Sequence, residues 1–462
     1  MTMGKIERNI SNLHDQDTGL LVGYKNPVTG KEEDSVGVPA AQAAALVKIV
    51  SSARQSAAMV GSSLSDVCFT SSALYGTRRR LNRSWFDWMN YALRERAMTL
   101  PTTYAVGGST ISEILAQIRV AVATDVDWII GDLGVINSTA AGDSLATMKA
   151  NVALCIDAIK AYGKRGLLIN ATPLATGNAS ASLSNMRKLA AVNAYMAQYG
   201  RSNGVLIYDA AKDIVDGADA NGYAITALLQ ADLIHYAHKG SRLIGAGLAA
   251  LVSPYLTPYP LLPCSQADSY HATDNPSQLC TNPLMAGTTA VTGASGLTGN
   301  MPTGRAVSAA GGTFTGTSAV ATRSDGFGQD WVITVTACSA NDSRLFLTLE
   351  PDMTANVTAG DLLQAVAQVE ITGATNLKGQ LFRLQPSVTA DFAGINEIAS
   401  ETSAIAEYSQ VDLTGGAFIA PVLTLPAGST NLRLFLELQW SSTTAAGVIK
   451  ISRVGINRLV TA

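Results

Sequence analysis

The sequence predicts a three-layer α/β fold with a flavodoxin-like parallel sheet, followed by an all-β sandwich or jelly roll. Two patterns predict this order. Between residues 57 and 253, apolar runs of strand length alternate with longer segments that place apolar residues at helical spacing. From residue 284 onward, short alternating runs are separated by glycine- and threonine-rich turn signals. The chain has 462 residues, 47% of them apolar, which is enough for several cores of about 150 residues each.

The chain divides into four predicted parts that differ in composition. The first part is polar and turn-rich and is expected to be an extended arm or a small hairpin around "NPVTG", with a helix expected over residues 39–53. The third part holds six of the 15 prolines and is expected to pack on its neighbours without regular structure. The four parts are an arm with a lead-in helix (1–52), the α/β part (53–253), a proline-rich linker (254–283) and the β part (284–462).

Five strands and five main helices are expected in the α/β part. The strands read as continuous apolar runs, as expected when helices cover both faces of a parallel sheet. The expected strands are residues 57–61, 102–108, 126–134, 166–173 and 204–210. The expected helices are residues 83–97, 111–123, 144–164, 184–200 and 240–252.

Composition and charge argue against several classes of function. The net charge is −3 and the pI is about 5.9, whereas nucleic-acid-binding proteins usually present a basic face, so no nucleic-acid partner is expected. No run of about 18 uncharged apolar residues occurs, so no membrane span is expected. The start, "MTMGKIERNI", lacks the apolar core of a signal peptide, so we expect synthesis in the cytoplasm.

The five cysteines give no sign of a metal site. None stands at a metal-ligand spacing, and no metal or cofactor is implied. Cys68 and Cys155 lie in apolar segments and are expected to be buried thiols. Cys264 and Cys280 flank a loop-like segment, and a disulfide between them stays open, although cytoplasmic synthesis argues against it.

Polar and glycine residues follow several expected strands, at the edge where parallel sheets place their active sites. "GSSL" with Ser63 follows the first strand, and the pair Gly107–Gly108 closes the second. Asn137 follows the third, and "DLIHYAHKG" with Asp232 and His235 comes late in the part. A serine nucleophile, two oxyanion donors and an Asp/His pair are the working set for acyl transfer.

In this order, the four segments resemble the SGNH (GDSL-like) hydrolase family across residues 57–250. "GSSL" is similar to the first block, "VGGST" to the second, "GVIN" to the third, and "DLIHYAHKGSRLIG", with Gly240 five residues after the histidine, to the fifth. The resemblance implies that Asp232 orients His235, which takes the proton from Ser63. It also implies an oxyanion hole made by the backbone N–H groups of Ser63 and Gly108 and by the Asn137 amide.

The sequence departs from the family pattern at two places. Ser62 stands where the family has an aspartate that usually braces the turn before the nucleophile. The third block, usually G-x-N-D, has one extra residue between Gly134 and Asn137 and is followed by Ser138 instead of an aspartate.

Less specific interpretations compete with these roles. A serine after a strand is an ordinary turn residue, Gly108 could end a strand, and Asn137 could cap a helix. His238 is a rival to His235 for the catalytic base. Other polar residues (His14, His271, Asp209) are expected to be incidental or structural, and the tryptophans (Trp85, Trp88, Trp331, Trp440) are expected in cores.

The arrangement of parts is similar to that of phage tail fibre and tailspike proteins, which trim host surface glycans. That resemblance implies a carboxylic ester hydrolase that removes O-acetyl groups from a bacterial capsule or O-antigen, with the β part binding glycan or holding an oligomer, such as a trimer. It implies assembly into a virion tail and action at the bacterial surface. The alternatives are a non-catalytic glycan-binding adhesin and a bacterial carbohydrate esterase, with secretion as the alternative localisation.

Overall fold

The computed structural model describes residues 54–66, 68–69, 79–292, 295–387, 392–397 and 412–459, together with two short strands nearer the amino terminus. These strands, β1 (Gly23–Lys25) and β2 (Glu32–Asp34), pair antiparallel and confirm the expected hairpin. The helix expected over 39–53 and His14 lie outside the described residues. Residues 55–462 form one compact unit, separate from residues 1–54.

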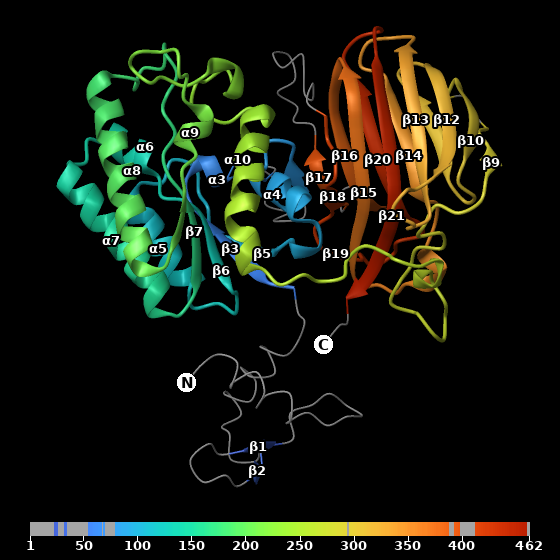
Figure 1. The fold of residues 1–462 in the computed structure, drawn as a ribbon, viewed down its shortest axis with the longest axis horizontal. Helices are drawn as coiled ribbons and strands as arrows, with labels where there is room; N and C mark the ends of the chain where they lie inside the picture. The colour runs from blue at the N-terminus through green and yellow to red at the C-terminus, as the bar shows by residue number, and fades with distance from the viewer. Residues whose placement is uncertain are drawn as a thin grey trace. The chain divides into compact units, whose positions relative to one another are not determined.

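A five-stranded parallel sheet forms the centre of the α/β part (Figure 1). Its order is β5-β3-β6-β7-β8, and every neighbouring pair is parallel. Numbered along the chain, this is the 2-1-3-4-5 order of flavodoxin-like folds, which confirms the prediction. The strands are β3 (Ser56–Val60), β5 (Thr99–Thr103), β6 (Trp128–Asp132), β7 (Arg165–Ile169) and β8 (Leu206–Tyr208).

Helices cover both faces of this sheet (Figure 1). One layer holds α5 (Ile111–Ala121), α7 (Leu145–Ala161) and α8 (Leu183–Asn203), in which α7 contacts both α5 and α8. The other layer holds α4 (Trp85–Leu93) and α10 (His238–Val252), which pack together. Serine N-caps explain several starts, because Ser84, Ser144 and Ser182 each accept a hydrogen bond from a backbone N–H of the first turn.

The second strand begins and ends earlier than expected. The prediction was residues 102–108, whereas β5 spans Thr99–Thr103 and "AVGG" lies in the loop that follows. Pro101 lies within β5, and a residue without an N–H is tolerated there because β5 is an edge strand. The glycines expected at the end of the strand are therefore free to form a loop over the edge of the sheet.

The β part consists of two sheets, as expected for an all-β sandwich. All neighbouring strands are antiparallel except the pairs β10–β12 and β17–β4. The rings of Phe314 and Trp440, from different sheets, lie 5.3 Å apart, so side chains of the two sheets meet in one core. The jelly-roll topology stays a prediction. The eight-stranded sheet contains β9 (Thr289–Ala290), β10 (Leu297–Met301), β12 (Phe314–Thr322), β13 (Gln329–Cys338), β15 (Leu362–Thr375), β18 (Ala417–Ile419), β19 (Leu423–Thr424) and β21 (Ala446–Leu459). The six-stranded sheet contains β4 (Arg79–Leu81), β11 (Ala306–Ala310), β14 (Arg344–Glu350), β16 (Leu377–Pro386), β17 (Ala393–Glu397) and β20 (Leu432–Trp440).

Strand β4 and helix α4 join the α/β part to the β part. Strand β4 pairs parallel with β17, and α4 contacts β18. The hydroxyl of Tyr91 on α4 donates a hydrogen bond to the backbone oxygen of Val369 in β15, at 2.9 Å. Sequence analysis missed β4, and the domain boundaries proposed there stay predictions.

The proline-rich linker packs on both parts, as expected. It contains only short 3-10 segments, and its Leu261 and Leu279 are buried. Cys264 and Cys280 are free thiols, so the disulfide that the sequence left open does not form. The Cys280 thiol instead contacts a buried ion pair, in which Arg305 Nη1 lies 2.9 Å from Glu350 Oε2.

Across the described ranges, no helix combines the length and the apolar character needed to cross a membrane.

Candidate active site

Ser63 is the first residue of a short helix that follows the central strand β3. The helix, α3 (Ser63–Asp66), begins two residues after Gly61, whose φ is +140°. A Cβ atom on Gly61 would lie 2.4 Å from Asp132 Oδ1, so only glycine fits at this turn. The turn places Ser63, half-buried, at the carboxyl end of the sheet, beside the point where the strand order reverses.

Asp232 and His235 form a tight pair in the loop before α10. Asp232 Oδ2 lies 2.5 Å from His235 Nδ1, and Oδ1 accepts the backbone N–H groups of Ile234 and His235 at 3.0 Å each. Partial burial opposes ionisation of Asp232, but these hydrogen bonds outweigh it and lower the pKa to about 2. The carboxylate therefore stays ionised at neutral pH and fixes the orientation of the imidazole ring.

The other ring nitrogen of His235 has no bond to the nucleophile in this structure. His235 Nε2 is buried and has no hydrogen-bond partner among the described residues. Hydrogen bonds between catalytic groups are often long in the absence of substrate and tighten when it binds. The structure thus brings Asp232 and His235 together, and it does not close the hydrogen bond from Ser63.

The loop that carries Gly108 lies beside the nucleophile. A Cβ atom on Gly107 would lie 3.9 Å from Ser63 Cβ, and Gly108 is exposed with a φ of +84°. Within the described part of the chain, the backbone N–H groups of Ser63 and Gly108 donate to no protein atom. Both N–H groups are therefore available to an acceptor that is not part of the described chain.

The Asn137 side chain contacts the loop that carries Gly108. Its Nδ2 donates to the backbone oxygen of Ser109 at 3.0 Å, which leaves one amide hydrogen for another acceptor. Asn137 belongs to helix α6 (Val135–Ala140), and the extra residue of the third block lies in the first turn of that helix. Gly134, with φ +62°, permits this approach, because a Cβ there would lie 2.2 Å from Ser109 O.

Residues 59–243 match the GDSL-like Lipase/Acylhydrolase family. The matched stretch contains all five predicted site residues, Ser63, Gly108, Asn137, Asp232 and His235. It spans less than half of the chain, and the β part lies outside it.

Solved structures similar to this chain include three esterases or acylhydrolases. A lipase/acylhydrolase from Enterococcus faecalis shares 18% identity, with 44% of this chain and 98% of that chain covered and a TM-score of 0.34. A carbohydrate acetylesterase from Sinorhizobium meliloti shares 14% identity, with 44% and 99% covered and a TM-score of 0.34. An acetylxylan esterase from Geobacillus stearothermophilus shares 13% identity, with 43% and 94% covered and a TM-score of 0.35. Among curated proteins, none matches the chain.

Sequence reasoning missed two residues that connect the GDSL-like blocks. Gln117 on α5 accepts the backbone N–H of Gly61 at 2.8 Å and donates to Ser109 Oγ at 3.1 Å. Asp132, at the end of β6, is buried and accepts hydrogen bonds from the turn before Ser63. An ionisable residue that closes the apolar run "WIIGD" was a signal for Asp132, whereas nothing in the sequence distinguished Gln117 from an ordinary helix residue.

The rival residues take structural positions. His238 is buried at the start of α10, where burial and the nearby charges of Lys239 and Arg242 lower its pKa to about 3. Asp209 accepts a hydrogen bond from Asn170 Nδ2 at 2.7 Å. Four of the five tryptophans were expected in cores, and these four are buried, as expected (Trp85, Trp88, Trp331, Trp440). His271 is exposed. No group of three His, Cys, Asp or Glu side chains suited to a metal occurs in the ranges that the structure describes.

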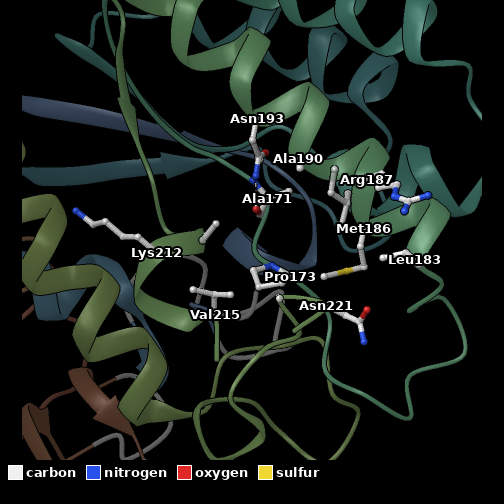
Figure 2. A pocket seen from close by; sticks show the side chains of 13 residues that line it. Ala171, Pro173, Leu183, Met186, Arg187, Ala190, Asn193, Lys212, Val215 and Asn221 are labelled. Atoms are coloured by element: carbon white, nitrogen blue, oxygen red, sulfur yellow. Dashed lines mark hydrogen bonds between the residues drawn. The ribbon is translucent and has the colours of Figure 1, made fainter. Parts of the chain in front are cut away.

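A cavity of about 350 Å³ lies near the carboxyl ends of β7 and β8. Figure 2 shows that the side chains of Arg187 and Lys212 point away from Pro173 in opposite directions. Their charged ends therefore contribute little to the lining, which is mainly apolar. None of the five predicted site residues lines this cavity. The lining residues are Ala171, Pro173, Leu183, Met186, Arg187, Leu189, Ala190, Asn193, Ala211, Lys212, Val215, Asn221 and Gly222.

Proposed function

We propose that the chain is a serine esterase that removes O-acetyl groups from a bacterial surface polysaccharide, either capsule or O-antigen. The observation that carries the proposal is the Asp232–His235 pair, whose Nε2 is unpartnered among the described residues. The pair belongs to the same matched stretch as Ser63, which stands at the end of a parallel strand. A histidine oriented by a carboxylate and left with an open nitrogen is suited to act as a general base.

The reaction follows from these positions. His235 Nε2 takes the hydroxyl proton as Ser63 Oγ attacks the ester carbonyl, and Asp232 stabilises the resulting imidazolium. The N–H groups of Ser63 and Gly108 and the free amide hydrogen of Asn137 bind the oxyanion. Collapse breaks the ester bond, and the leaving sugar alkoxide takes the proton from His235. A water molecule, deprotonated by His235, then attacks the acyl-serine and releases acetate and Ser63.

Features of the site favour an uncharged acyl group on a large alcohol. Val106 is 58% exposed and Gly108 is also exposed, so the oxyanion loop is open to solvent. Asp66 lies on the same short helix as Ser63, and its carboxylate lies beside Gly107. Burial raises the pKa of Asp66, and the hydrogen bond from the Gly107 N–H partly opposes this rise. Two carboxyl groups, from Asp66 and Asp232, disfavour an anionic acyl group. An open, acidic site suits an acetyl ester carried on a polymer.

The setting that we propose is a phage tail, assembled in the host cytoplasm and acting at the bacterial cell surface. The large β part, attached through β4 and α4, supports this setting because it adds a rigid all-β module to the catalytic part. In this proposal it binds glycan or holds a homo-oligomer, such as a trimer. The alternative setting is a bacterial carbohydrate esterase that is secreted.

A non-catalytic glycan-binding adhesin is the second candidate function. The lack of a hydrogen-bond partner at His235 Nε2 among the described residues favours it, because proton transfer from Ser63 needs that bond. The intact oxyanion donors argue for catalysis, since a binding protein has no need of unpaired N–H groups beside a serine.

The proposal is tested by incubating the full chain with purified O-acetylated capsule or O-antigen and measuring released acetate. We expect acetate release by the parent chain and a loss of about a thousandfold or more in Ser63→Ala and His235→Ala. The same glycan, de-O-acetylated by mild alkali, is the substrate control. Binding of the glycan without acetate release, equal in all three proteins, would favour the adhesin.

A further inference from the structure

One buried carboxylate holds a serine on each side of the nucleophile, Ser62 before it and Ser65 two residues after it. Asp132 Oδ2 accepts a hydrogen bond of 2.6 Å from Ser62 Oγ, and Oδ1 accepts the Ser62 backbone N–H at 3.0 Å. On the other side of Ser63, Ser65 Oγ donates to Asp132 Oδ1 at 2.8 Å and accepts the Asp132 backbone N–H at 3.1 Å. Ser63 therefore lies between two serines that are bound to the same side chain.

The same carboxylate also connects the nucleophile to the third block. Asp132 Oδ2 accepts the backbone N–H of Gly134 at 2.8 Å, and Gly134 immediately precedes the helix that carries Asn137. Asp132 is only 4% exposed, and its recorded hydrogen bonds come from serine hydroxyls and backbone N–H groups. A buried carboxylate that depends on these donors enforces their geometry, because each lost donor leaves it less compensated.

We propose that Asp132 is a positioning residue for Ser63 and replaces, from strand β6, the brace that the family's aspartate gives at position 62. In this chain the donor, Ser62 Oγ, belongs to the turn, and the acceptor, the Asp132 carboxylate, belongs to the strand. The proposal rests on the esterase function proposed above. Asp132 touches no reacting atom and acts by fixing the backbone on both sides of Ser63.

The main test compares Asp132, the last residue of β6, with Asp127, the residue directly before β6. Asp132→Asn keeps the side-chain volume but presents an amide to the Ser62 and Gly134 donors. Asp127→Asn is the matched control, because Asp127 also accepts a serine N–H and hydroxyl, from Ser56, far from the site. With 4-nitrophenyl acetate, we expect kcat to fall about tenfold to hundredfold in D132N with little change in KM, and both to stay at the parental value in D127N.

A reciprocal exchange separates positioning from general stability. Ser62→Asp alone places two carboxyl groups in contact and is expected to lower kcat, as is Asp132→Ser alone. The double variant S62D/D132S restores one carboxylate and one hydroxyl, and we expect its kcat to exceed both single variants by about tenfold or more. The rate at which a fluorophosphonate labels Ser63, followed by mass spectrometry, is expected to change in parallel.

The outcomes distinguish this inference from the proposed function. A parental kcat in D132N, with activity lost in Ser63→Ala, would overturn the positioning role and leave the esterase intact. A rate in Ser63→Ala equal to the parent would overturn the esterase. If D132N does not fold, Ser62→Ala and Ser65→Ala remove one donor each, and parental kcat in both would contradict the role of Asp132.

Discussion

At the residue scale, two histidines three positions apart have opposite environments. His235 Nδ1 contacts the Asp232 carboxylate, and its Nε2 has no hydrogen-bond partner among the described residues. His238, the first residue of α10, is buried. Burial first, and then the charges of Lys239 and Arg242, lower the pKa of His238 to about 3. A buried histidine with so low a pKa is a weak proton acceptor at neutral pH, which favours His235 as the base.

The buried His238 predicts an acid-sensitive contribution to stability. Its pKa falls from 6.5 when unfolded to about 3 when folded, so the unfolded state binds the extra proton. Stability from this residue is therefore complete above pH 6.5 and is lost as the pH falls toward 3. When the pH is lowered from 7 to 5, the free energy of unfolding is expected to decrease in both proteins. We expect the decrease to be about 2 kcal/mol smaller in His238→Gln than in the parent. Urea titrations at both pH values measure it, and an equal fall in the two proteins would contradict the buried neutral state.

At the element scale, the segment after the nucleophile holds the catalytic and β parts together. Trp85 Nε1 on α4 donates to the backbone oxygen of Leu64 at 3.1 Å, directly beside Ser63. Two turns later, the Tyr91 ring lies 5.2 Å from that of Phe418 in β18. The support of the nucleophile is therefore continuous, from α3 through α4 to the eight-stranded sheet.

This connection predicts that the α/β part does not work alone. A chain that ends at residue 256 leaves β4 without its partner β17 and exposes Trp88 and Tyr91, which are buried in the full chain. We expect it to aggregate or to show at least about tenfold lower specific esterase activity, because the face of α4 is uncovered. Size-exclusion chromatography and 4-nitrophenyl acetate hydrolysis measure both effects. A monomeric truncated chain with parental activity would contradict the structural role of the β part.

At the scale of the whole molecule, local patterns predicted the elements well and their long-range partners poorly. The sheet strands were found because both faces are buried, so each reads as an apolar run. Strand β4 was missed because "RRL" is short and charged, and its partner β17 lies more than 300 residues away in the sequence. No local pattern reports such a pairing.

The candidate site shows the same division between local and distant information. Asp232 and His235 could be predicted because their three-residue spacing is a property of one loop. The contacts of Asp132 could not, because they join β6 to a turn 70 positions earlier in the chain. The bond from Asn137 to Ser109 likewise depends on how helix α6 meets the loop after β5, which no local pattern reports.

The central claim is that Ser63 and His235 act together as the nucleophile and base of an esterase. The most direct measurement is the rate of 4-nitrophenyl acetate hydrolysis by the full chain beside Ser63→Ala and His235→Ala. Ser202→Ala and His271→Ala are the matched controls, since both residues are exposed and lie outside the site. We predict turnover in the parent and in both controls, and background rates in the two site variants. Equal rates in all five proteins would contradict the claim.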